Sequence, residues 1–168
     1  MDARTDTEIR VEKSELAKAI LGQGVLSPKP MGRKFMPHIL IVDDHSACRS
    51  LIKMILLKQG LDQIDEACDG RVALSKLADA SYDLVICDLF MPSLDGFGLL
   101  GELRTKNVLK GLPVIIVTCE TRRDFISKAI ELGISGYVSK PFKPSALISA
   151  VCKVLSHRRT AEVAAGCQ

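Results

Sequence analysis

Three carboxylates, one hydroxyl and one amine stand at or just after the ends of short apolar segments of the sequence. These side chains belong to Asp43, Asp44, Asp88, Thr118 and Lys140. Carboxylates that lie within a few ångströms of one another repel, so such a group needs a neutralising cation. Mg²⁺ suits this role because it takes one or two carboxylates and keeps water and phosphoryl oxygens as its other ligands. A carboxylate beside Mg²⁺ and an ammonium group is well placed to attack a phosphoryl group and form an acyl-phosphate.

The segments that would position these side chains alternate between strand and helix. Three continuous apolar runs predict strands buried on both faces, at residues 39–42, 84–87 and 114–117. Two shorter strands are predicted at residues 63–67 and 137–138, of which the first is the more polar. Apolar residues recur at helical spacing after each strand, which predicts helices near residues 48–55, 73–78, 99–103, 125–130 and 147–155.

A strand followed by a helix, repeated along the chain, predicts an α/β fold with a parallel sheet and helices on both of its faces. The three apolar strands would lie in the centre of this sheet, and the polar strand at an edge. In such a sheet, ligands bind beyond the carboxyl ends of the strands, which is where the polar side chains named above would meet.

Taken one at a time, these residues also have ordinary structural interpretations. An aspartate after a strand is often a helix N-cap, a Lys-Pro pair is often a turn, and Thr118 alone would be a loop hydroxyl. The functional interpretation rests on the combination, because the set occupies the ends of four predicted strands in chain order.

Composition excludes several classes of function. Of the 168 residues, those from 37 to 156 carry fourteen basic and fourteen acidic side chains, and the chain has no Trp. A neutral domain without stacking aromatics argues against direct nucleic-acid binding. No apolar run reaches the roughly 18 residues of a membrane span, and residues 1–10 do not resemble a secretory signal. The six cysteines form no C-x-x-C pair, which predicts reduced thiols in a cytoplasmic protein.

Three regions are predicted along the chain. Residues 1–36 form an arm, with a weakly amphipathic helix over residues 7–21 and a Gly- and Pro-containing linker after it. The α/β domain spans residues 37–157. Residues 158–168 form a tail, which is too short for an output domain.

The sequence resembles the receiver domain of two-component response regulators over about residues 37–157. Four motifs carry the resemblance: ILIVDD ending at Asp44, VICDLFMP around Asp88 with Asp95-Gly96 behind it, VT ending at Thr118, and GYVSKPF around Lys140. The resemblance implies a flavodoxin-like (βα)5 three-layer sandwich with strand order 2-1-3-4-5. It is strongest to the stand-alone members of the family that act in chemotaxis.

The family's site residues carry over onto matching positions. The resemblance implies that Asp88 is the phosphoacceptor, that Asp44 binds Mg²⁺ directly and that Asp43 binds it through water. The backbone carbonyl of Phe90 would be a further metal ligand. Lys140 would pair with the phosphoryl group, and its bond to Pro141 would be cis.

Two further implied roles belong to Thr118 and Tyr137, which would form the switch. Thr118 would move toward the phosphoryl group as Tyr137 turns inward, and the surface of the fourth and fifth helices and the fifth strand would change its partner preference. The chain has its own residues at three neighbouring positions, namely Phe90, Cys119 and Glu120. Because they border the path of the attacking water, an unusual phosphoryl lifetime is a hypothesis here.

The function that follows is a stand-alone response regulator, phosphorylated by a sensor histidine kinase and signalling to a separate target. The alternative is a relay shuttle that passes the phosphoryl group to a histidine phosphotransfer protein. We expect a cytoplasmic monomer or weak dimer that binds neither membranes nor nucleic acid. It would not be an enzyme beyond catalysing its own phosphorylation and dephosphorylation.

Other proteins built on a similar sheet fit the sequence less well. A flavodoxin needs a Ser/Thr/Gly-rich phosphate loop after the first strand, where this chain has the acidic Asp43-Asp44. A haloacid-dehalogenase-type phosphatase needs its two aspartates two residues apart rather than adjacent. A degenerate receiver that signals without phosphate is disfavoured because all five site residues are present.

Overall fold

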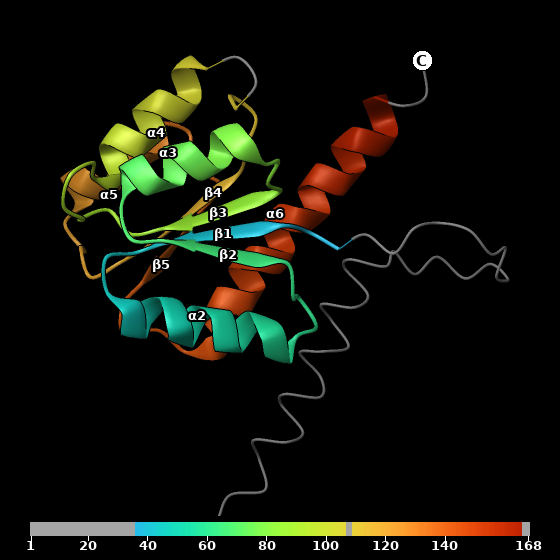
Figure 1. Cartoon of the computed structure of the whole chain (residues 1–168), viewed down its shortest axis with the longest axis horizontal. Coiled ribbons are helices and arrows are strands. Elements are labelled where there is room, and N and C mark those ends of the chain that lie inside the picture. The colour runs from blue at the N-terminus through green and yellow to red at the C-terminus, as the bar shows by residue number, and fades with distance from the viewer. Residues whose placement is uncertain (1–35, 107–108, 166–168) are drawn as a thin grey trace, which may run out of the picture.

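The computed structural model describes residues 36–106 and 109–165, with side chains to residue 157. Five parallel strands form one sheet in the order β2-β1-β3-β4-β5 (Figure 1). The strands are β1 (Ile39–Val42), β2 (Ile64–Ala67), β3 (Leu84–Cys87), β4 (Val114–Thr118) and β5 (Gly136–Ser139). The helices are α2 (Ser46–Lys58), α3 (Gly70–Asp79), α4 (Gly96–Thr105), α5 (Arg123–Glu131) and α6 (Pro144–Ala165). This confirms the predicted flavodoxin-like fold and its strand order.

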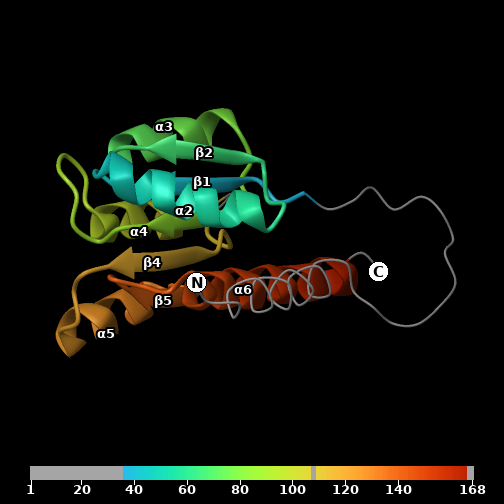
Figure 2. The same ribbon diagram turned by 90° about the horizontal axis from the view of Figure 1, so that it is seen from below.

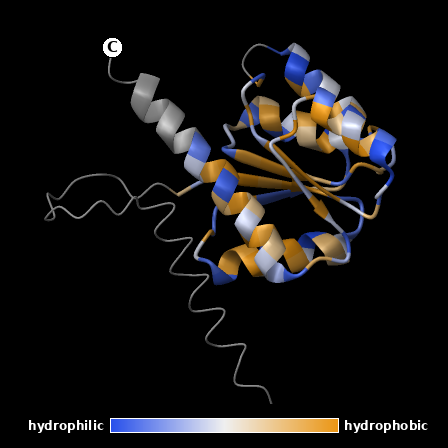
Figure 3. Cartoon of the chain, turned by 180° about the vertical axis from the view of Figure 1, so that it is seen from behind, coloured by the Kyte–Doolittle hydropathy of each residue, from blue (hydrophilic) through white to orange (hydrophobic). Residues whose placement is uncertain are grey.

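The helices form two layers with the sheet between them. Helices α2 and α6 cover one face, and α3, α4 and α5 lie on the other (Figures 1 and 2). Strands β1, β3 and β4 are fully buried, whereas β2 at one edge is mostly half-buried. Figure 3 shows the central strands in orange, the colour of hydrophobic residues, and helices around them that carry both hydrophobic (orange) and hydrophilic (blue) residues. The prediction of a polar edge strand is therefore confirmed.

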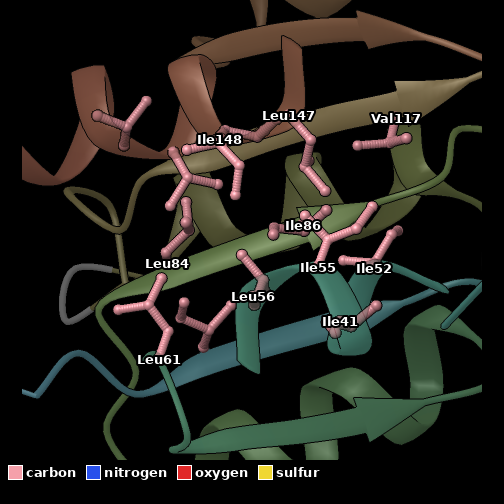
Figure 4. Close-up of a cluster of buried hydrophobic side chains, with 14 of the residues drawn as sticks. Ile41, Ile52, Ile55, Leu56, Leu61, Leu84, Ile86, Val117, Leu147 and Ile148 are labelled. Carbon is pink, nitrogen blue, oxygen red and sulfur yellow. The ribbon is translucent and has the colours of Figure 1, made fainter. Parts of the chain in front are cut away.

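Successive side chains of a strand point to opposite faces of the sheet, so each central strand contributes side chains to two separate apolar clusters. On β1, Ile39 and Ile41 point toward α2 and α6, where Ile52, Leu56 and Leu147 pack against them (Figure 4). The intervening β1 residues point toward the opposite helices, into a cluster with Leu77, Leu99 and Leu103. The sheet is thus held rigidly from both sides, which fixes where its strands end.

Two glycines end helices in the left-handed region that disfavours other residues. Gly60 follows α2 with φ +80°, and Gly133 follows α5 with φ +77°. A glycine just after the last apolar residue of a helical pattern is a typical helix end. Helix α6 continues to Ala165, past the helix predicted near residues 147–155 and into the predicted tail. Its last turns contain good helix formers, and none of residues 145–165 is Gly or Pro.

Two apolar residues that lie at helical spacing within the predicted helices are exposed. Leu51 on α2 is 43% exposed and Ile130 on α5 is 61% exposed. Helical spacing marks a broad apolar face, but only the part of it that meets the sheet is buried. The predicted helix over residues 7–21 and its linker lie outside the described residues. None of the helices in the described ranges is long and apolar enough to span a membrane.

Candidate functional site

The carboxyl ends of β1, β3 and β5 bring together an ammonium group and two carboxylates. Lys140 Nζ donates to Asp43 Oδ2 and to Asp88 Oδ2, each at 2.6 Å. Asp43 is 1% exposed and Asp88 is 8% exposed. The parallel register of β1 with β3 places Asp43 and Asp88 side by side, directly after the paired residues Val42 and Cys87. Residues far apart in the sequence therefore form one compact charged centre.

Lys140 keeps its charge in this centre. Burial on its own lowers the pKa of Lys140, but the hydrogen bonds and negative charges of Asp43 and Asp88 outweigh it, and the pKa lies above its ordinary value. The ammonium group therefore offsets much of the repulsion between the two buried carboxylates. The Lys140–Pro141 peptide bond is cis, as the family resemblance implies.

Backbone donors orient the carboxylate of Asp88. Its Oδ1 accepts hydrogen bonds from the amides of Leu89 at 2.6 Å and Phe90 at 3.4 Å. Its Oδ2 faces Lys140. This carboxylate lies at the carboxyl-terminal edge of the sheet, where a ligand beyond the strand ends can reach it.

The loop after Asp88 passes close over the first residue of α4. A Cβ on Gly96 would meet the carbonyl oxygen of Asp88 and lie 2.8 Å from Cα of Leu89. Both obstacles are backbone, so neither can rotate away. Gly96 thus allows α4 to start directly beneath the loop that carries Asp88.

We expect Gly96→Ala to lower the free energy of unfolding by about 2–3 kcal/mol, because the loop or the helix must shift to relieve overpacking. Urea denaturation followed by circular dichroism measures this. Gly101→Ala is the matched control, since Gly101 lies on the same helix and its Cβ would meet nothing within 4 Å. That variant should gain up to about 1 kcal/mol from helix propensity. Equal effects of the two variants would contradict the close approach.

Asp43 and Asp44, called the acid pair from here on, form a second group with His45. Ligand atoms of Asp43, Asp44 and His45 all lie within 4.8 Å of one another. Asp88 is outside this group and faces Lys140 instead. Two carboxylates and an imidazole are suitable donors for a divalent cation. His45 was detectable in the sequence only as the residue that follows the acid pair.

Side chains from α2 and β2 hold the loop of the acid pair in place. Arg49 donates from one guanidinium nitrogen to the carbonyl oxygens of Asp43 at 2.7 Å and Asp44 at 3.3 Å. Its Nε donates to Glu66 at 3.2 Å, and Lys53 donates to the same carboxylate at 2.8 Å. Hydrogen bonds from Lys53 and Arg49 lower the pKa of Glu66. The loop is therefore anchored by its backbone, which leaves its carboxylates for other partners.

The two predicted switch residues are linked through one loop residue. Thr118 is 1% exposed, and its Oγ1 accepts from the amide of Glu120 at 3.4 Å. The Tyr137 hydroxyl donates to the carbonyl oxygen of Glu120. The Tyr137 ring packs at the edge of the second apolar cluster, and burial raises its pKa. The structure thus contains a chain of contacts from Thr118 to Tyr137.

Phe90 belongs to an aromatic cluster beside the site. Its ring lies edge-on to Phe97 at 6.4 Å and to Phe125 at 5.5 Å between centroids. Arg122 lies over the Phe125 ring at 4.2 Å, and Lys128 lies over the Phe97 ring at 4.6 Å. Phe90 remains 46% exposed. The cluster joins the loop after Asp88 to α4 and α5, although its members come from distant parts of the sequence.

The five cysteines in the described ranges are free thiols. Burial raises the pKa of Cys48 and of Cys87, which disfavours their reactive thiolate forms. Neither Cys48 nor Cys87 therefore supports a role for thiol chemistry at the site.

Comparison with known proteins identifies close similarity over the described domain. Residues 39–152 match the family model of the response regulator receiver domain. The chemotaxis protein CheY-3 of Vibrio cholerae is 39% identical over 116 residues, which are 69% of this chain and 89% of that protein. The chemotaxis protein CheY of Pseudomonas aeruginosa is 41% identical over 69% of this chain and 94% of its own.

The solved structures agree. The crystal structure of the chemotaxis protein CheY4 of Vibrio cholerae superposes with a TM-score of 0.68 at 31% identity. The match covers 72% of this chain and 100% of that protein. Both kinds of similarity concern the domain built on the five strands.

Proposed function

The chain belongs to the response regulator receiver domain family, and on that premise we propose that it accepts a phosphoryl group on Asp88 and changes its binding surface in response. Members of this family are signalling proteins rather than conventional enzymes, and they interact with histidine kinases and with downstream targets. The observation that carries the assignment is the placement of Lys140 within 2.6 Å of both Asp88 and Asp43.

In the proposed reaction, an oxygen of Asp88 attacks the phosphorus of a phosphohistidine. The new bond joins this carboxylate oxygen to phosphorus, and the bond from phosphorus to the imidazole nitrogen breaks. Lys140 lies where it can donate to the oxygens of the transferred group, and Thr118 is the nearby hydroxyl that can do the same after a small movement.

Mg²⁺ is the proposed cofactor, held by Asp43 and Asp44 with Asp88 and the Phe90 carbonyl as further ligands. When bound, it would supply charge neutralisation for the carboxylates and for the phosphoryl oxygens. The donor set fits, because carboxylates of the acid pair lie together at the loop after β1. The chain's own part is to anchor the backbone of this loop through Arg49, which leaves the carboxylates available to the cation.

A stand-alone role with a separate target is the proposed output, and a relay to a histidine phosphotransfer protein is the alternative. The named relatives are chemotaxis proteins, which supports the first. A cytoplasmic monomer or weak dimer without direct contact to nucleic acid or membrane is proposed with it. Incubation with acetyl phosphate and Mg²⁺, followed by intact-mass spectrometry, tests the central step. One added phosphoryl group is expected, and no addition would contradict the proposal.

Thr118→Val is expected to leave phosphorylation largely intact and to uncouple Tyr137 from it. Valine keeps the shape of threonine but removes the hydroxyl that accepts from the Glu120 amide. The same hydroxyl would donate to the phosphoryl group in the phosphorylated state. A hydrogen bond to a charged group contributes about 1.5–3 kcal/mol, which shifts a two-state equilibrium roughly ten- to a hundredfold. The NMR signals of the Tyr137 ring, with and without beryllofluoride, provide the measurement. A full response of Tyr137 in this variant would place the coupling elsewhere.

We propose that an exposed apolar stripe on α2 is part of the surface that contacts the kinase. Leu51, Met54 and Leu57 are 43%, 47% and 46% exposed, and α2 begins at Ser46, two residues after Asp44. We expect Met54→Glu to slow phosphotransfer from the cognate kinase at least tenfold, because it places a charge in the contact. Phosphorylation by acetyl phosphate should stay unchanged, since that donor does not touch α2. Val72→Glu, on α3, is the matched control.

A further inference from the structure

His45 occupies a position where the fold does not need an imidazole. It is the N-cap of α2, with an extended backbone, and its side chain makes no capping hydrogen bond. Residues favoured at an N-cap accept a hydrogen bond from the first turn of the helix, which this ring does not do. The side chain is 72% exposed, so it contributes little to packing. A substitution of His45 should therefore leave the fold intact.

The ring is aimed at the acid pair instead. Its Nδ1 lies 2.7 Å from Asp44 Oδ1 and 3.7 Å from Asp43 Oδ1. Ligand atoms that share a small divalent cation, each at about 2.0–2.2 Å from it, lie roughly 3–4 Å from one another. The backbone amide of His45 also donates to Asp43 Oδ1 at 2.8 Å, which fixes the orientation of that carboxylate. The contact between His45 Nδ1 and Asp44 Oδ1 is a hydrogen bond. A bound cation would take the place of its proton, and the two ligand atoms would then have to move apart by only a few tenths of an ångström to reach roughly these separations.

The carboxylate of Asp43 divides the site into two halves. Its Oδ2 faces Lys140 and, beyond it, Asp88. Its Oδ1 faces the side on which Asp44 and His45 lie. Lys140 therefore does not stand between the imidazole and the two carboxylates.

We propose that Nδ1 of His45 is an additional protein ligand of the cation held by Asp43 and Asp44, and that it makes the site favour first-row transition-metal dications over Mg²⁺. Imidazole nitrogen suits Ni²⁺, Zn²⁺ and similar ions, whereas Mg²⁺ prefers oxygen ligands. Mg²⁺ would still bind through the carboxylates. The inference rests on the proposed metal site and adds both a ligand and a metal preference to it.

Calorimetric titration of the full chain with Ni²⁺ and with Mg²⁺ tests this. His45→Gln should lower the affinity for Ni²⁺ at least about tenfold, as losses around metal sites commonly do, and should change that for Mg²⁺ less than about twofold. His157→Gln is the matched control, because His157 is an exposed histidine on α6, and it should change neither affinity. Equal Ni²⁺ affinities of the wild type and His45→Gln would overturn the proposal.

Asp44→Asn separates this proposal from the proposed function. If Asp44→Asn weakens the binding of both metals while His45→Gln weakens neither, the metal site stands and His45 is not a ligand. If Asp44→Asn changes neither, the acid pair is not the metal site, and both proposals fail at that point. A ¹⁵N spectrum of the histidine rings gives a direct readout. Zn²⁺ should shift the Nδ1 signal that His45→Gln lacks, and Mg²⁺ should not. An unshifted signal with Zn²⁺ would also overturn the proposal.

Discussion

Replacing Asp88 with asparagine is expected to abolish phosphorylation of the chain by acetyl phosphate and by a histidine kinase alike. The amide keeps the shape of the side chain and still offers an oxygen to the amides of Leu89 and Phe90. It lacks the anionic oxygen that attacks phosphorus, so no acyl-phosphate can form. Intact-mass spectrometry in the presence of Mg²⁺ should show one added phosphoryl group on the wild type and none on Asp88→Asn.

Asp62→Asn serves as the control, because Asp62 is an exposed aspartate away from the strand ends, and it should be phosphorylated like the wild type. Circular dichroism of Asp88→Asn should match the wild type, which separates loss of the nucleophile from loss of the fold. Labelling that survives in Asp88→Asn would place the phosphoacceptor on another residue.

The architecture could be predicted from the sequence because the apolar pattern is unambiguous where the sheet is buried. Strands β1, β3 and β4 are continuous apolar runs, and each of their residues is buried. Strand order did not follow from this pattern, since nothing in a buried run says which neighbour it pairs with. It came from the resemblance of the motifs to a known family.

Positions at the strand ends could be predicted, but the pairing of their side chains could not. Chain order and parallel strands bring Asp43, Asp88 and Lys140 to one edge. Which carboxylate oxygen Lys140 meets depends on rotamers and on the path of the loop after β5. The contact joins residues 97 positions apart, and local sequence carries no signal for it.

Two features beside the site were missed for related reasons. The contact of His45 with Asp44 needs a ring that turns away from its own helix, which residue type alone does not indicate. The contact of Phe90 with Phe125 joins two loop-flanking segments 35 positions apart, and the sequence showed only that Phe90 is large and apolar. Exposure of Leu51 and Ile130 likewise depends on which elements lie opposite them.

Lys140→Met is expected to lower the free energy of unfolding by about 3–5 kcal/mol in the absence of divalent cations. Methionine has a similar length and fills similar space, so the main loss is the charge. Without it, the carboxylates of Asp43 and Asp88 remain buried beside each other with no counter-charge, at 1% and 8% exposure. Urea denaturation in the presence of a chelator measures the change.

The pH of this measurement follows from the pKa of Lys140. Its folded-state pKa lies above the unfolded value, so its stabilisation is fully present below the unfolded pKa and is lost only as pH rises through the folded one. Neutral pH therefore captures the whole contribution. Lys143→Met is the matched control, because Lys143 is an exposed lysine in the same loop, and it should change stability by less than about 0.5 kcal/mol.

The double variant Asp88→Asn with Lys140→Met shows whether repulsion between carboxylates is the cause. If it is, neutralising Asp88 should restore part of the stability that Lys140→Met removes, and the two changes will not be additive. Mg²⁺ should restore stability to Lys140→Met as well, because a cation held by the acid pair replaces the missing positive charge. Strict additivity together with no response to Mg²⁺ would mean that Lys140 stabilises the protein through packing of its aliphatic chain, and the charged centre would have to be reinterpreted.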